Sequence, residues 1–197
     1  MKKHKALFLD RDGIINKLVK YSYGYDSPQS LKNIIINNQT IEMVRWANKY
    51  NLLVIEISNQ PGVAKGKMTQ ETSDAIEVQI HKLLALENAR VDKSYICLHH
   101  PKAKVQSLAK MCKCRKPKPG LLLQAARELN IDLRKSVFLG DKATDVEAGR
   151  AAGCKTIIFL HKDDVAEKVN ASEKTKADYK VTDLQKVIPI LIEIFGI

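Results

Sequence analysis

The sequence predicts an α/β protein with a doubly wound, mostly parallel, Rossmann-like sheet. Short apolar runs alternate along the chain with longer amphipathic stretches, and this alternation is typical of strands that are connected by helices. The run at 52–58 is almost continuously apolar, as expected for a strand that helices cover on both faces. Polar or charged clusters directly follow four of the runs. Because ligands of such sheets bind outside the carboxyl ends of the strands, these clusters also predict where a functional site lies.

The expected helices are marked by local signals. Thr69 is a good N-cap for the amphipathic stretch that follows it. Pro119 stands where a first helical turn tolerates proline, and Gly153 closes another stretch. Pro189 falls inside the last helical pattern and is expected to kink or restart it. The expected strands are 5–9, 52–58, 94–98, 136–140, 156–160 and 179–181, and the expected helices are 39–50, 70–86, 119–130, 144–152 and 184–195.

Length and composition favour a single domain that spans residues 1–197. The hydrophobic content of 45% is sufficient for one core, and no linker-like segment or internal repeat interrupts the sequence. The apolar runs are too short to cross a bilayer, and no signal-peptide apolar region follows the basic residues 1–5. We therefore expect a cytoplasmic protein that binds no membrane. The lack of coiled-coil heptads favours a monomer.

The formal charge of +11 has two interpretations. It can reflect a solvated, Lys-rich surface, or it can attract an anionic ligand such as a phosphorylated metabolite or a nucleic acid. Aromatic residues make up only 6% of the chain, and no nucleic-acid-binding motif stands out. A small phosphorylated molecule is therefore the expected partner, and nucleic acid is not.

Two acidic clusters follow predicted strands. Asp10 and Asp12 are separated by one residue, and Gly13 gives the backbone the freedom to turn after them. Asp141 and Asp145 follow a second strand. Carboxylates that crowd together need a counter-ion, and an oxygen-rich site suits Mg²⁺. The clusters therefore predict a magnesium site that can draw a phosphate towards Asp10.

Cationic and polar side chains complete the pattern. Arg115 and Lys116 suit the oxygens of a transferring phosphoryl group, and Ser58 and Asn59 offer a hydroxyl and an amide to the same oxygens. Each motif alone is common, because Asp-x-Asp often marks a turn and Asp often caps a helix. In this order, with each motif near a predicted strand end, they indicate phosphoryl transfer.

These motifs resemble those of the haloacid dehalogenase (HAD) superfamily. The resemblance implies that Asp10 is a nucleophile that becomes an aspartyl-phosphate and that Asp12 is the general acid and base. It also implies that Ser58 and Lys116 hold the phosphoryl group. Mg²⁺ would be bound by Asp10, the backbone carbonyl of Asp12 and Asp141, with Asp145 outside the ligand set. The matching segments are Asp10-Arg11-Asp12-Gly13, Ser58-Asn59-Gln60, Arg115-Lys116-Pro117 and Gly140-Asp141-x-x-x-Asp145.

Three cysteines and one histidine form a second motif. Cys97, His99, Cys112 and Cys114 offer the donors of a structural zinc site, which would fix the Lys-rich loop between them. Free buried thiols are the alternative, and His100 is an alternative to His99 as a ligand. The remaining cysteine, Cys154, lies in an apolar run and is expected in the core.

The zinc motif narrows the resemblance. Cys-x-His-His-Pro followed by Cys-x-Cys-Arg-Lys-Pro is similar to the bacterial D-glycero-D-manno-heptose 1,7-bisphosphate phosphatases over about residues 5–160. The related histidinol-phosphate phosphatases have a shorter loop before the second cysteine pair. The resemblance implies that His99 is the ligand and that Asn59, Gln60, Arg115 and Lys142 contact the substrate. The spacing between motifs leaves no room for a separate cap domain.

The expected reaction is therefore Mg²⁺-dependent removal of the 7-phosphate, which leaves heptose 1-phosphate for nucleotide-activated heptose synthesis and hence lipopolysaccharide or capsule. The alternatives are a phosphatase for histidinol phosphate or a nucleic-acid 3′-phosphate, and a zinc-stabilised binding module with a degenerate active site. The segment 17–30, which should form a substrate-facing loop, departs from the family pattern, as do Ile14 and Pro61. These departures leave the preferred substrate and anomer open.

Overall fold

A six-stranded parallel sheet forms the centre of the protein in the computed structural model, which describes residues 3–161 and 176–197. The strand order is β5-β4-β1-β6-β7-β8, and a separate two-stranded sheet pairs β2 with β3. The strands are β1 (Ala6–Leu9), β2 (Val19–Tyr21), β3 (Gly24–Asp26), β4 (Leu53–Asn59), β5 (Lys93–Cys97), β6 (Val137–Gly140), β7 (Lys155–Phe159) and β8 (Tyr179–Val181). The α-helices are α1 (Asn38–Lys49), α2 (Gln70–Leu86), α3 (Gly120–Glu128), α4 (Ala143–Ala152) and α6 (Val187–Phe195).

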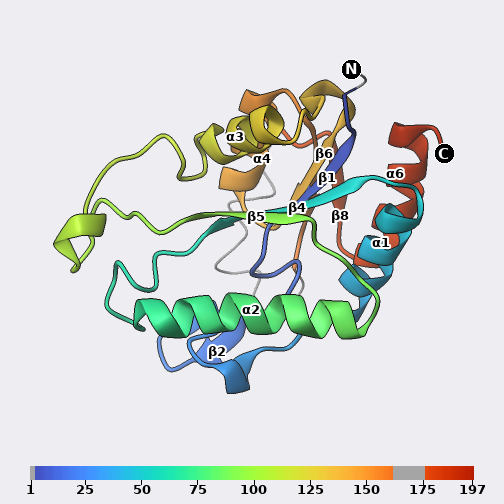
Figure 1. Cartoon of the computed structure of the whole chain (residues 1–197). Helices are drawn as coiled ribbons and strands as arrows, with labels where there is room; N and C mark the ends of the chain where they lie inside the picture. The colour runs from blue at the N-terminus through green and yellow to red at the C-terminus, as the bar shows by residue number, and fades with distance from the viewer. Residues whose placement is uncertain (1–2, 162–175) are drawn as a thin grey trace.

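Helices cover both faces of the large sheet (Figure 1). Successive side chains of a strand point to opposite faces. Leu7 and Leu9 therefore pack with the buried faces of α1, α2 and α6, whereas Ala6 and Phe8 pack with α3 and α4. The predicted doubly wound α/β fold is confirmed.

The strand order reverses its direction between β1 and β6. From β1 the chain moves outward through β4 to β5, and it then crosses back to place β6 on the other side of β1. The crevice at such a switch point is where open α/β sheets bind ligands. Asp10 follows β1 and Asp141 follows β6, so both acidic clusters lie at this point.

The predicted elements are all present among the described residues, with boundaries shifted by one or two positions. Pro119 is the N-cap residue of α3 and precedes the first helical turn. The last helical pattern divides into a 3₁₀ turn, Leu184–Lys186, and α6, which restarts at Val187. Pro189 is the third residue of α6, where its missing N–H costs no intrahelical hydrogen bond.

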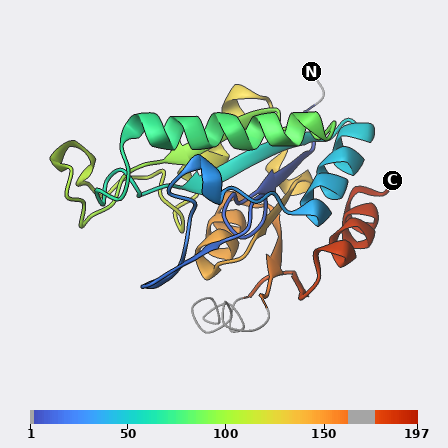
Figure 2. The same ribbon diagram turned by 90° about the horizontal axis from the view of Figure 1, so that it is seen from below.

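The segment 17–30, which we expected to be a loop, contains the β2–β3 hairpin. The hairpin turns at Ser22 and Tyr23, and Gly24, the first residue of β3, has a φ of +111°. The rings of Tyr21 and Tyr23 stack at a centroid distance of 5.4 Å. It projects from the body of the protein (Figure 2). Such a short segment gives little periodic signal, because a strand of three residues shows only one full alternation. No cap domain lies over the switch point in the described part of the chain.

The segment between β5 and α3 extends beyond the end of the sheet (Figures 1 and 2). Apart from a 3₁₀ turn at Gln106–Leu108 it has no regular structure before α3. Among residues 3–161 and 176–197, no helix combines the length and apolarity needed to cross a membrane.

Gly153 ends α4 in the left-handed region, with a φ of +90° and open space where a Cβ would stand. We expect Gly153→Ala to lower the free energy of unfolding by about 1 kcal/mol through backbone strain. Gly153→Asn should cost less, because Asn tolerates this conformation better. Urea denaturation measures both variants, and an equal loss in the two would contradict a backbone origin.

Candidate active site and metal cluster

Three buried carboxylates converge at the switch point. Oxygen atoms of Asp10, Asp141 and Asp145 lie within 4.8 Å of one another, and all three residues are almost completely buried. Gly13 makes this approach feasible: its φ is +96°, and a Cβ there would lie 2.2 Å from Asp141 Oδ2. The predicted convergence of the two acidic motifs is therefore present in the structure.

Lys116 neutralises part of this charge. Its Nζ lies 2.7 Å from Asp10 Oδ1 and 2.7 Å from Asp145 Oδ1, and it donates to the carbonyl of Ile57 at 2.8 Å. Asn59 accepts from the backbone N–H of Lys116 and donates to its carbonyl, each at 3.1 Å. Burial alone would lower the pKa of Lys116, but the two carboxylates raise it above its usual value. Lys116 is therefore a fixed cation beside Asp10.

The electrostatics of Asp10 reflect its crowded surroundings. Burial raises its pKa to about 6, Lys116 opposes that effect, and the charge of Asp145 adds to it. The backbone N–H of Arg11 donates to Asp10 Oδ1 at 2.8 Å, which leaves Oδ2 of the carboxylate on the side of Lys142. A further cation at this position would stabilise the ionised form.

Lys142 places its ammonium among three oxygens of the site. Its Nζ lies 3.0 Å from Asp141 Oδ1, 3.5 Å from the backbone carbonyl of Asp12 and 3.7 Å from Asp10 Oδ2. These are the three residues that the sequence resemblance assigns to Mg²⁺. Two carboxylates and a carbonyl form the hard oxygen donor set that Mg²⁺ prefers, and the ammonium shows that this set attracts a cation. The residues therefore fit a magnesium ion.

Asp12 is ionised and held by several donors. Arg11 contacts both of its oxygens, at 3.3 and 3.4 Å. Asn16 donates to Oδ1 at 3.0 Å, and Ser27 and Gln60 donate to Oδ2 at 2.8 and 2.5 Å. Burial raises the pKa of Asp12, but the charge of Arg11 and the hydrogen bonds outweigh it and lower the pKa to about 2.

A cavity of about 540 Å³ opens beside these groups. The hairpin contributes Tyr25, Asp26 and Ser27 to its wall, which agrees with the expectation that the segment 17–30 faces the substrate. The predicted site residues that line the cavity are Asp10, Asp12, Asn59, Arg115, Lys116 and Lys142. Ser58 and Gln60 do not line it; they are buried, and Gln60 Nε2 donates to Ser58 Oγ at 2.8 Å as well as to Asp12.

Several contacts to Asp12 and Asp141 were not predicted from the sequence. His161 Nε2 lies 3.0 Å from Asp141 Oδ2, and its position just after β7 could have suggested this by the strand-end rule. Asn16 and Ser27 donate to Asp12 from turns that carry no recognisable motif. Arg11 lies between Asp10 and Asp12, but the motif by itself assigns it no role.

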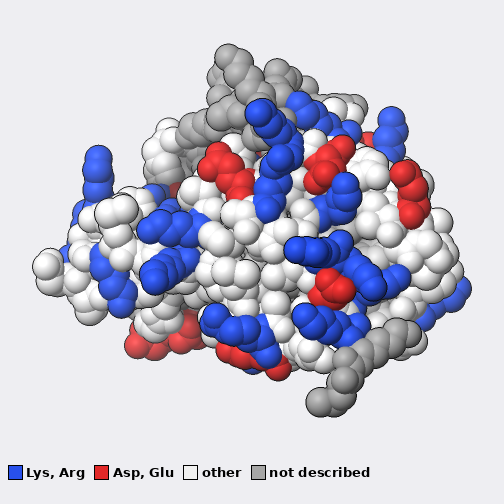
Figure 3. Space-filling view, turned by 90° about the horizontal axis from the view of Figure 1, so that it is seen from above, with Lys and Arg blue, Asp and Glu red and all other residues white. Residues whose placement is uncertain are grey.

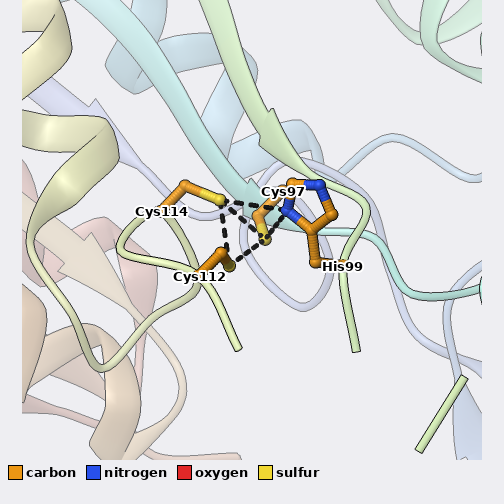
Figure 4. Close-up of side chains that lie close together, drawn as sticks. All are labelled: Cys97, His99, Cys112 and Cys114. Atoms are coloured by element: carbon orange, nitrogen blue, oxygen red, sulfur yellow. Dashed lines mark hydrogen bonds between the residues drawn. The ribbon is translucent and has the colours of Figure 1, made fainter. Parts of the chain in front are cut away.

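The predicted zinc ligands also come together (Figure 4). The Sγ atoms of Cys97, Cys112 and Cys114 are 3.1–3.6 Å apart, which is too long for a disulfide. His99 Nδ1 lies 3.3 Å from Cys114 Sγ and 3.8 Å from Cys97 Sγ. Tetrahedral coordination at Zn–S distances of about 2.3 Å places sulfurs roughly 3.7 Å apart. The cluster therefore fits one metal ion and is consistent with a zinc site, with His99 rather than His100 as the histidine.

Charge is mixed on the face of the protein that Figure 3 draws. On the face drawn in Figure 3, Lys and Arg are spread widely, with Asp and Glu between some of them. This distribution differs from the single stripe or patch of cations that typifies a nucleic-acid footprint.

The fold and the site together define a HAD-like hydrolase. Asp-x-Asp follows the first strand of the parallel sheet, a buried Lys contacts the first of these aspartates, and a second acidic pair follows a neighbouring strand. The HAD-hydrolase-like family model matches residues 113–187. The crystal structure of a HAD-like phosphatase from Mesorhizobium loti is similar, with a TM-score of 0.81 and 28% identity over 100% of this chain and 88% of that one.

The relatives that are most informative about the reaction share one name. D-glycero-β-D-manno-heptose-1,7-bisphosphate 7-phosphatase from Yersinia pestis is 33% identical over 93% of this chain and 94% of its own length. Its namesake from Escherichia coli K12 is 34% identical over 85% and 86%. The chain belongs to this family of heptose-bisphosphate phosphatases. A D,D-heptose 1,7-bisphosphate phosphatase from B. bronchiseptica, solved with magnesium and phosphate, has a TM-score of 0.78 and 27% identity over 96% of this chain and 98% of that one.

Proposed function

We propose that this protein hydrolyses the 7-phosphate of D-glycero-β-D-manno-heptose 1,7-bisphosphate and leaves heptose 1-phosphate. The observation that carries the proposal is the joint presence of Asp10, Asp12 and Lys116 at one cavity, with Asp141 clustered against Asp10. The chain also aligns almost end to end with relatives of that name. The β-anomer is proposed because those relatives are named for it.

The reaction proceeds in two displacements at Asp10. A carboxylate oxygen of Asp10 attacks the phosphorus, the bond to the sugar oxygen breaks, and an aspartyl-phosphate forms. Lys116, whose Nζ lies 2.7 Å from Asp10 Oδ1, balances the charge of the transferring group. Asp12 protonates the departing sugar oxygen and then removes a proton from the water that hydrolyses the acyl-phosphate. Asp10, Asp141 and the carbonyl of Asp12 would hold Mg²⁺, which would supply Lewis-acid stabilisation to the phosphoryl group.

Asp12 must gain a proton before it can act as an acid. In the ligand-free site its pKa is about 2, so it is ionised at neutral pH. A bound phosphate places negative charge beside it and raises its pKa, and the phosphate monoester can itself deliver the proton. This coupling means that Asp12 becomes an acid only when the substrate is in place.

The cavity matches a doubly phosphorylated sugar. Its volume of about 540 Å³ falls in the usual range for small-molecule sites. Arg115 is exposed to the cavity and is anchored by a hydrogen bond from Nη1 to the carbonyl of His99, at 3.2 Å. We assign Asn59, Arg115 and Lys142 to substrate binding. Gln60, also expected there, is buried outside the cavity and acts through its hydrogen bonds to Asp12 and Ser58. Contact of Ser58 with the phosphoryl group stays a prediction.

The metal cluster is proposed to hold zinc in a structural role. Cys114 directly precedes Arg115 and Lys116, so an ion bound there fixes the backbone that delivers both cations to the cavity. A closed set of four protein ligands is typical of structural zinc. The product would enter nucleotide-activated heptose synthesis for lipopolysaccharide or capsule. The cytoplasmic location, the monomeric state and the absence of a nucleic-acid partner stay predictions.

The first test measures phosphate release from both anomers of the heptose bisphosphate, with Mg²⁺ and after chelation, beside histidinol phosphate and a 3′-phosphorylated oligonucleotide. We expect Mg²⁺-dependent preference for the β-anomer.

Asp10→Asn should lower the rate by at least about a thousandfold because an amide cannot attack phosphorus, with a melting temperature close to that of the wild type. Residual turnover near the wild-type rate would refute the nucleophile assignment.

Removing the Lys142 ammonium should make Mg²⁺ bind more tightly. In Lys142→Met the ammonium no longer competes for the three oxygens, so we expect the dissociation constant for Mg²⁺ to fall by about tenfold, or roughly 1.4 kcal/mol. Calorimetric titration without substrate measures this. Lys135→Met, which removes an exposed lysine paired with Asp132, is the control. Equal affinity in all three proteins would contradict competition at the site.

Elemental analysis should find about one zinc ion per chain. Cys114→Ser should lose the zinc, lower the melting temperature and reduce the phosphatase rate through misplacement of Arg115 and Lys116. Cys154→Ala removes a cysteine outside the cluster and should keep the zinc. Full zinc content in Cys114→Ser would show that the cluster is not the binding site.

A further inference from the structure

Arg11 occupies the centre of the catalytic loop, yet the reaction assigns it no task. Its side chain is only 2% exposed and does not line the cavity. Nε and Nη2 contact the two oxygens of Asp12 at 3.3 and 3.4 Å, and Nη1 contacts Glu77 Oε2 at 3.2 Å. The guanidinium therefore connects Asp12, the proposed general acid, to Glu77 on α2. This helix packs on the face of the sheet to which Leu7 and Leu9 of β1 point.

Glu77 is itself fixed from the other side. His81, one helical turn later, places Nε2 3.1 Å from Glu77 Oε1 and 3.5 Å from Glu56 Oε2. Ser94 on β5 lies 2.9 Å from His81 Nε2 and 3.2 Å from Glu56 Oε2. Hydrogen bonds to Glu56 and Glu77 raise the pKa of His81 to about 9. Glu77 therefore lies between two cations, Arg11 and His81.

The two-point contact between the Arg11 guanidinium and Asp12 explains why this series of contacts matters. Asn16, Ser27 and Gln60 each donate to a single oxygen of Asp12. Among the described residues that contact Asp12, only Arg11 reaches both oxygens, and a planar guanidinium on two carboxylate oxygens fixes the plane of that carboxylate. A buried guanidinium in turn needs a second anion to hold its own orientation, and Glu77 supplies it.

We propose that Glu77 is a positioning residue for Asp12, which it orients through Arg11 towards the leaving-group oxygen. The proposal rests on the proposed function, because it takes Asp12 as the general acid. Glu56, His81 and Ser94 act one step further out by holding Glu77. The side-chain contacts of this network reach Asp12 and not Asp10, so loss of the network should impair proton transfer selectively.

A double-mutant cycle tests whether Glu77 acts through Asp12. In the wild type, Glu77→Gln should lower kcat/KM for the heptose bisphosphate by about tenfold, which is part of the factor of about 10² to 10⁴ that general acid catalysis contributes. In an Asp12→Asn background the same change should have almost no further effect. Additive losses in the double variant would overturn the proposal, because they would show that Glu77 acts independently of Asp12.

The leaving group gives a second readout that a merely structural role would not move. 4-Nitrophenyl phosphate releases an anion that needs no proton, so kcat/KM for this substrate should change less than about twofold in Glu77→Gln. Arg11→Lys keeps the charge but loses the planar guanidinium that contacts both oxygens of Asp12. It should therefore lower kcat/KM for the heptose bisphosphate and spare that for 4-nitrophenyl phosphate, as Glu77→Gln does. Glu87→Gln, at the end of the same helix, breaks the exposed pair with Arg45 and should leave both substrates unaffected.

The outcomes separate the two hypotheses. A wild type that does not hydrolyse the heptose bisphosphate, or an Asp12→Asn variant of full activity, refutes the proposed function itself. If the wild type is active and Asp12→Asn is impaired, but Glu77→Gln lowers the rates of both substrates equally or of neither, only the positioning role is refuted. The rate on 4-nitrophenyl phosphate also reports the fraction of folded sites, so a variant that misfolds is recognised by a loss on both substrates and by its melting temperature.

Discussion

Repulsion among three buried carboxylates is the constraint around which this protein is organised. Asp10, Asp141 and Asp145 lie within 4.8 Å of one another, and such an arrangement is unstable unless cations share the space. Lys116 neutralises the cluster from one side and Lys142 from the other. The same charge balance that keeps the site folded makes it receptive to a divalent cation and to a phosphate.

The long segment between β5 and α3 brings Lys116 to the site. The segment leaves the sheet, forms the cluster of Cys97, His99, Cys112 and Cys114, and returns at Arg115 and Lys116. It has little regular structure, and a metal ion bound by the cluster, as proposed, would replace the core that it lacks. Asn59, at the end of β4, then fixes the backbone of Lys116 through two hydrogen bonds. Zinc, if bound as proposed, would act on catalysis through position alone.

A second layer of contacts separates the roles of the two aspartates that share one loop. Asp10 is buried beside other acids, and its pKa is raised to about 6. Asp12, two residues away, meets Arg11 and several neutral donors, and its pKa is lowered to about 2. Environments that shift the pKa values of two neighbouring carboxyl groups in opposite directions allow the groups to perform different steps of one reaction. The hairpin contributes to this separation, because Ser27 from its end donates to Asp12.

The sequence by itself determined the α/β class, the order of the elements along the chain and the motifs at the strand ends. Local periodicity and the rule that parallel strands present their carboxyl ends at one edge located the acidic motifs of Asp10 and Asp141 in advance. Donor chemistry and the family resemblance named Lys116 and the metal cluster. Only the tertiary structure decided that residues 17–30 form a hairpin and that Lys142 lies among the proposed metal ligands. It also decided that Gln60 supports Asp12 from below the cavity, and that Arg11 connects Asp12 to Glu77. Such contacts join residues far apart in the chain, and no period or motif encodes them, because they depend on how two packed elements happen to face each other.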